Sequence, residues 1–83
     1  MVIYRKVKRA VDGDTLETYR KFNGTNYIRL NGINTPEKGQ RGYLIAKRKM
    51  QRVENKVITV TPKARDKYGR IVADVRYKRK KVR

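Results

Sequence analysis

Acidic residues are few in this sequence, and their positions suggest chemistry. Only seven of the 83 residues are Asp or Glu. Four of them lie in turn-like segments between the predicted strands and helix: Asp12, Asp14, Glu37 and Asp66. In Asp12-Gly13-Asp14-Thr15 two carboxylates flank a glycine, so their oxygens can converge on a hard cation. Taken alone, this segment is explained better by an ordinary Asp-Gly turn between two strands.

The segment Asn34-Thr35-Pro36-Glu37 also has two interpretations. In the structural one, Thr35 caps a helical turn that begins at Pro36, and Glu37 lies beside the positive end of that turn. This interpretation is favoured when the segment is taken alone. In the functional one, Glu37 activates a water molecule, while Asn34 and Thr35 present oxygens to a metal bound by Asp14.

Two arginines complete the set of groups that phosphodiester hydrolysis requires. Arg29 lies on a predicted strand between two apolar residues and therefore points to the opposite face from both. Arg70 ends the loop 66–70, in which Gly69 permits the turn that directs the arginine. Each also has an ordinary explanation, as a solvated strand residue and as part of a polar loop. Two guanidinium groups, a cation and a base would stabilise the charged transition state and activate water.

The charge balance predicts a polyanionic partner. The chain has 24 Lys and Arg residues and a formal charge of +17, so it repels itself unless a polyanion or salt screens it. Nucleic acid is the expected partner, because phosphate binding by Lys and Arg releases condensed counterions. An anionic membrane is disfavoured, since no helix is basic on one face and rich in Trp, Phe and Leu on the other. Cys and His are absent, which leaves catalysis to carboxylates, Lys, Arg or Tyr with an oxygen-ligated metal.

Hydrophobic alternation and turn residues predict five strands and one helix. Asn23-Gly24 supplies the positive φ angles of a tight turn, so the second and third strands should pair antiparallel. Pro62 should end the fourth strand. Leu44, Ile45, Ala46, Met50 and Val53 mark the apolar face of the helix. The predicted strands span residues 2–11, 15–22, 27–33, 56–61 and 70–77, and the predicted helix spans residues 42–54.

This order of elements predicts a mainly β (α+β) fold, a five-stranded oligonucleotide-binding (OB-fold) barrel with one helix between strands 3 and 4. We expect one domain at residues 1–77, followed by a basic tail at residues 78–83. The sequence has neither 18 consecutive apolar residues nor the apolar region of a signal peptide. A cytoplasmic protein that does not enter a membrane is therefore expected.

Over nearly its whole length the sequence resembles the staphylococcal nuclease family. The similar segments occur in the family's order and with similar spacing: Val11-Asp12-Gly13-Asp14-Thr15, Ile28-Arg29-Leu30, Gly32-Ile33-Asn34-Thr35-Pro36-Glu37 and Asp66-Lys67-Tyr68-Gly69-Arg70. Agreement of four segments in order is far less expected by chance than agreement of one. The resemblance implies a calcium-dependent nuclease with little sequence specificity.

The resemblance also implies a role for each site residue. Asp14 would be a direct calcium ligand, Thr35 a ligand through its backbone carbonyl, and Glu37 the general base. Asn34 stands where the family usually has a second aspartate ligand, so it offers an oxygen without a charge. Asp12 would act from outside the ligand shell.

The remaining implied roles concern the substrate. Arg29 and Arg70 would bind the scissile phosphate, Tyr68 would contact a substrate phosphate, and Lys67 would add positive potential. Family members usually continue into further helices after the fifth strand, so we also expect self-association to shield apolar surface. Two alternatives remain at this point: a binding module of the same fold with a decayed site, and a plain basic structural protein. The second alternative explains the charge but not the acidic segments.

Overall fold

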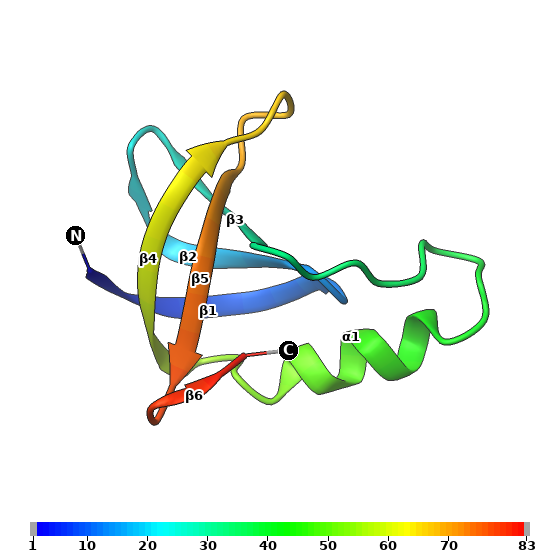
Figure 1. The fold of residues 1–83 in the computed structure, drawn as a ribbon. Helices are drawn as coiled ribbons and strands as arrows, with labels where there is room; N and C mark the ends of the chain where they lie inside the picture. The colour runs from blue at the N-terminus through cyan, green and yellow to red at the C-terminus, as the bar shows by residue number, and fades with distance from the viewer. Residues whose placement is uncertain (1, 83) are drawn as a thin grey trace.

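The computed structural model describes residues 2–82 and consists of a curled sheet with a helix at one end (Figure 1). The helix follows the third strand and precedes the fourth, as predicted. The elements in chain order are β1 (Ile3–Asp12), β2 (Thr15–Phe22), β3 (Thr25–Leu30), α1 (Tyr43–Gln51), β4 (Val57–Arg65), β5 (Ile71–Tyr77) and β6 (Lys80–Lys81).

Strand pairing closes the first five strands into a barrel. The sheet order is β3-β2-β1-β4-β5-β6. An additional parallel pairing of β3 with β5 closes the first five strands on themselves, and β6 lies outside the closed part. Inward-facing residues fill the barrel, among them Val7, Leu16, Ile28 and Val60, none of which is measurably exposed. The predicted OB-fold barrel is confirmed. Within residues 2–82, no helix is long and apolar enough to cross a membrane.

The turn between β2 and β3 forms as predicted, but the third strand is shifted. Asn23 and Gly24 have φ angles of 50° and 82°, and Phe22 pairs directly with Thr25. Because the turn has only two residues, β3 begins at Thr25 and not at Tyr27. It ends at Leu30, since Asn31-Gly32 forms the next turn. The predicted range 27–33 was therefore wrong at both ends.

The prediction that Pro62 ends the fourth strand was also wrong. β4 continues to Arg65, and Pro62 lies opposite Ala73 of β5. The register shifts between Pro62 and Ala64, so the proline is next to a bulge. A proline is tolerated at a bulge because the ladder is already interrupted there.

Helix α1 is shorter than predicted, and only its end is buried. Met50 is fully buried and Val53 nearly so, whereas Leu44 and Ile45 are each 62% exposed. The first half of the helix therefore projects beyond the barrel (Figure 1). After Gln51 the chain leaves the helix and docks on β1, where the N–H of Asn55 donates to the carbonyl of Val7 at 2.7 Å.

Part of the predicted basic tail belongs to the sheet. β6 pairs with the end of β5 through Arg76 opposite Lys81 and Tyr77 opposite Lys80. Val82 closes this hairpin by donating its N–H to the carbonyl of Val75, and its side chain joins the core. Arg83, the last residue of the predicted tail, lies outside the described residues.

Candidate functional site

The turn between β1 and β2 fixes the position of Asp14. The Asp14 N–H donates to Oδ1 of Asp12 at 3.1 Å, which closes the turn on itself. The Asp14 carbonyl accepts the N–H of Leu30 at 2.8 Å, which ties the turn to the end of β3. Asp12 therefore shapes the turn, while the Asp14 side chain is left to face the neighbouring strands.

Gly13 allows the loop after β3 to approach the same turn. A Cβ atom at Gly13 would lie 2.7 Å from Cβ of Ala46 and 2.8 Å from Oγ1 of Thr35. Ala46 lies on α1 and Thr35 lies in the loop after β3, so a side chain at position 13 would force one of these two segments to move. A glycine is thus needed here for close contact between the turn, the loop and the helix.

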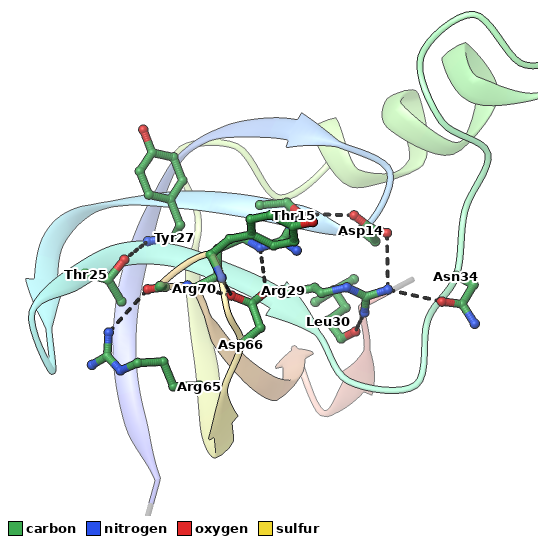
Figure 2. A network of polar contacts seen from close by, with 12 residues as sticks. Asp14, Thr15, Thr25, Tyr27, Arg29, Leu30, Asn34, Arg65, Asp66 and Arg70 are labelled. Atoms are coloured by element: carbon green, nitrogen blue, oxygen red, sulfur yellow. Dashed lines mark hydrogen bonds and ion pairs between the residues drawn. The ribbon is translucent and has the colours of Figure 1, made fainter.

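Arg29 joins the turn to the loop (Figure 2). Its Nη2 atom donates to Oδ1 of Asn34 at 3.1 Å and lies 3.6 Å from Oδ2 of Asp14. Its Nη1 atom donates to the carbonyl of Leu30 at 2.8 Å. The guanidinium group of Arg29 is thereby held against three oxygen atoms, while 23% of the Arg29 side chain remains exposed.

Arg70 approaches the same turn from the other side. Its Nε atom donates to Oδ2 of Asp66 at 2.7 Å, and its Nη1 atom donates to the Thr15 hydroxyl at 3.0 Å. The Thr15 hydroxyl in turn donates to Oδ1 of Asp14 at 3.0 Å. The two arginines are thus connected through Asp14 and Thr15 in one polar chain, which Figure 2 shows from end to end.

The two carboxylates of this chain have opposite pKa shifts. Burial raises the pKa of the Asp14 carboxyl, and its hydrogen bond with Asp12 adds to the rise, while Thr15 and Arg29 act against it. Burial also acts to raise the pKa of Asp66, but hydrogen bonds outweigh it and the pKa is lowered. These bonds come from the N–H and guanidinium of Arg70 and from the N–H of Tyr68.

Oxygen donors suited to a hard cation meet beside Arg29. Asp14 Oδ2 and Asn34 Oδ1 both face its Nη2 atom, and carboxylate, amide and carbonyl oxygens are the ligands that calcium takes. Thr35 lies next to them and contacts the position of Gly13. Within residues 2–82, no three His, Cys, Asp or Glu side chains gather as a metal cluster. The donor set therefore fits calcium in type but carries little negative charge.

The other predicted site residues are not part of the polar chain. Glu37 is exposed in the long loop before α1, where its N–H donates to Oε1 of Gln40 at 2.8 Å. No helical turn forms at Thr35-Pro36, so the capping interpretation of this segment was wrong. Lys67 Nζ and Arg70 Cζ lie 5.3 and 5.4 Å from the centre of the Tyr68 ring, which is 72% exposed.

Sequence reasoning missed two residues that position the arginines. Thr15 is 2% exposed and links Asp14 to Arg70. Asp66 was noted as acidic but given no role, yet its carboxylate binds both the N–H and the guanidinium of Arg70. The spacing of four residues between Asp66 and Arg70 was an available signal. Nothing in the sequence indicates the partner of Thr15, because it depends on how the barrel closes.

Comparisons with known proteins identify the family of this chain. The family model described as "Staphylococcal nuclease homologue" matches residues 27–83, which is more than half of the chain. The chain belongs to the staphylococcal nuclease family. The matched range includes both arginines and the loop 31–42, whereas Asp12 and Asp14 precede it.

A curated relative from Escherichia coli is described as an "Uncharacterized endonuclease". It is 39% identical over 74 residues, which cover 88% of this chain and 48% of the relative. The chain thus spans about half the length of this relative. The similarity extends beyond the range matched by the family model, since 74 residues of 83 must include part of the first two strands.

Proposed function

We propose that this chain is a nuclease that hydrolyses phosphodiester bonds of DNA, RNA or both, with calcium and with little sequence specificity. The observation that carries the proposal is the connection of Arg29 and Arg70 through Asp14 and Thr15. Family membership and the description of the Escherichia coli relative as an endonuclease support it. A binding surface alone would not require two guanidinium groups fixed against the same turn.

In this proposal Arg29 and Arg70 bind the scissile phosphate. Each guanidinium has nitrogen atoms held by protein oxygens and others free to donate. A planar fork of this kind can bind two phosphate oxygens at once and stabilise the negative charge that develops in the transition state. Because both groups are already oriented, little reorganisation accompanies the reaction. Tyr68 and Lys67 border Arg70 and would contact a neighbouring phosphate.

The proposed metal ligands are Asp14, Asn34 and the backbone carbonyl of Thr35. Calcium would supply positive charge beside the phosphate. Burial raises the pKa of the Asp14 carboxyl, so its negative charge is poorly solvated and a bound cation would stabilise it. Arg29 already shares the oxygens of Asp14 and Asn34, so this chain holds the phosphate-binding arginine and the metal ligands in one place.

Glu37 is the proposed general base that accepts a proton from the attacking water. Within the described residues, its carboxylate makes no ion pair or hydrogen bond, so it is available for this role. Its loop includes Gly32, Gly39 and Gly42, all with positive φ angles. The loop must present the carboxylate to the water when substrate is bound.

A second candidate function is a nucleic-acid-binding module with a weak or inactive site. The observation in its favour is the amide of Asn34 where the family usually has a carboxylate, together with the exposed position of Glu37. Binding would then depend on the basic surface and on bases stacking against exposed tyrosines.

The two functions are separated by an assay of cleavage on plasmid and single-stranded DNA and on RNA, with calcium and with a chelator. The nuclease proposal expects cleavage that requires calcium. It also expects loss of cleavage in Arg70→Ala and partial recovery in Arg70→Lys, which keeps the charge without the fork. Lys47→Ala on α1 is the control and should retain cleavage. Binding without cleavage in every condition would establish the second function instead.

A further inference from the structure

A groove runs along helix α1 from the candidate site to the hairpin of β5 and β6. A cavity of about 710 Å³ lies between the loop after β3 and the helix, and Gly13, Asn34 and Thr35 are part of its wall. A second cavity of about 330 Å³ lies between the end of the helix and the hairpin. Lys49 and Arg52 line both cavities, so the two cavities adjoin, and together they are called the groove. Figure 1 shows β6 beside the end of α1.

The second cavity is lined by five basic and three apolar or aromatic residues. Its apolar floor is formed by Val53, Tyr77 and Val82. Its basic lining residues are Lys49, Arg52, Lys78, Lys80 and Lys81. No acidic residue of the described part of the chain lines either cavity.

Most acidic residues of the described chain are engaged outside this groove. Within residues 2–82 the ion pairs join Glu17 to Arg9, Asp14 to Arg29, Asp74 to Lys63 and Asp66 to Arg70. Asp74 on β5 also accepts a hydrogen bond from Asn31 at 3.1 Å, which with the charges of Lys63 and Lys81 lowers the pKa of its carboxyl. Glu54, just after the helix, accepts the N–H of Ala10 at 2.8 Å. The Glu37 carboxylate makes no polar contact within the described residues, but Glu37 lines neither cavity, so the charge of the groove is available to a partner from outside.

The hairpin turn gives an independent indication that these charges have a function. Lys78 and Arg79 form a two-residue turn, with φ angles of 50° and 69°. Both residues are in the left-handed region, which is unfavourable for side chains that carry a Cβ and are not Asn or Asp. The chain uses the suitable pair Asn23-Gly24 in the two-residue turn between β2 and β3, where both φ angles are also positive. This turn therefore places two cations in a conformation that costs stability, which agrees with a functional use of the charge.

We propose that this groove is a second nucleic-acid contact, which binds the phosphate backbone of the substrate several nucleotides from the scissile bond. The inference rests on the proposed function, since the strand that enters the groove is the one held by Arg29 and Arg70. A strand bound at the arginines passes Asn34 and Thr35, follows Lys49 and Arg52 along the helix, and reaches Lys78 and Lys80 at the hairpin. OB-fold proteins bind about 4 to 16 nucleotides, which allows one strand to reach both places.

The contact has a specific energetic signature. Each phosphate neutralised on a single strand contributes about 0.7 to the log-log slope of affinity against salt. Loss of one contact lowers the slope by about 0.7, which corresponds to about fivefold weaker binding at 0.1 M salt. A substrate too short to reach the hairpin gains nothing from these contacts. Long and short substrates therefore respond differently to changes in the hairpin.

The test is the double variant Lys78→Asn, Arg79→Gly, which copies the turn of Asn23-Gly24. It should melt at the same temperature as the parent chain or higher, because the strain is relieved. Binding to a 20-nucleotide single-stranded DNA in chelator should fall about fivefold, with a salt slope lower by about 0.7, because Lys78 lines the groove and Arg79 does not. Calcium-dependent cleavage of bis(4-nitrophenyl) phosphate should stay the same. A second variant, Lys49→Gln, should also weaken binding, and it tests the groove even if the turn variant is unstable.

The matched control is Lys8→Gln, Lys21→Gln, which removes the same charge from exposed strand residues that line neither cavity. An equal loss of DNA binding in the control would overturn the proposal, because the lower net charge alone would then explain the loss of affinity in the turn variant. Normal DNA binding in the turn variant and in Lys49→Gln would also overturn it. If the turn variant loses binding only to phosphatidylglycerol vesicles, the groove is a membrane contact and not a nucleic-acid contact. Absence of cleavage in the parent chain would refute the nuclease function alone, since the DNA-binding measurements use no calcium.

Discussion

Arg70 donates to the hydroxyl of Thr15 across 3.0 Å, although the two residues are 55 positions apart in the sequence. Thr15 begins β2 and pairs with Arg29 of β3, while Arg70 immediately precedes β5. The contact is possible because β3 and β5 pair in parallel and close the barrel. Barrel closure thus brings both arginines to the same threonine.

Replacement of Thr15 by Val tests whether this hydroxyl positions Arg70. Valine preserves the buried shape but removes the bridge between Asp14 and Arg70. We expect turnover on single-stranded DNA to fall about tenfold, which is the effect of one lost hydrogen bond to a charged group. The cost in unfolding free energy should be about 1 kcal/mol. Thr15→Ser keeps the hydroxyl and should retain most activity; equal activity in both variants would exclude the positioning role.

Asp66→Asn should change stability in a way that depends on pH. The folded pKa of Asp66 lies below its ordinary value of 3.8, so the negative charge is favoured by folding. Its stabilising effect is complete above the unfolded pKa and disappears as the pH falls through the folded pKa. At pH 7 the variant should be about 1 kcal/mol less stable, because the site is partly solvated. Thermal melts at pH 7 and below pH 3 measure this, and a constant difference across that range would contradict it.

Glu37→Gln tests the general base. The side chain is exposed and makes no polar contact within the described residues, so the melting temperature should stay the same. Turnover should fall by about 100- to 10,000-fold while binding of DNA in chelator is retained. Glu54→Gln makes the same chemical change away from the site and should retain turnover. Normal turnover in Glu37→Gln would assign the proton transfer to another group.

Local sequence signals predicted the parts of this fold that depend on neighbouring residues. Asn23-Gly24 defined a hairpin because its φ angles follow from the two residues themselves. The position of Pro62 within β4 could not be predicted in this way, because the bulge beside it depends on pairing with β5. The helix illustrates the same limit. Its apolar pattern includes Leu44 and Ile45, but the barrel is too short to cover them.

The site shows the same division between local and distant interactions. The Asp12-Asp14 turn is held by contacts within three residues and was visible in the sequence. The link from Arg29 to Asn34 depends on the path of the loop after β3, which no local rule gives. Family resemblance identified the residues but not the contacts between them. Resemblance also did not indicate the groove at β6, since that depends on pairing of the basic tail.

Asn34→Asp tests the metal site directly. A second carboxylate beside Asp14 should strengthen calcium binding, because ligand charge tunes the affinity of calcium sites. Two opposite unit charges about 4 Å apart interact by roughly 4 kcal/mol at an effective dielectric of 20, but desolvation removes much of this. Arg29 reduces the gain in calcium affinity further, because its Nη2 atom lies 3.1 Å from Oδ1 of Asn34 and would pair with the new carboxylate. A net gain of about 1 kcal/mol, or roughly fivefold in affinity, is expected.

Calorimetric titration of calcium into both proteins measures this gain, with and without a nucleotide bisphosphate. The bisphosphate should increase the difference, because its phosphates draw Arg29 away from position 34 and leave the new carboxylate to the metal. Asn34→Ala is the control, since it removes the oxygen and should weaken calcium binding below that of the parent chain. If all three proteins bind calcium equally, position 34 does not contact the metal. The convergence of Asp14 and Asn34 on Arg29 would then serve only to orient that arginine.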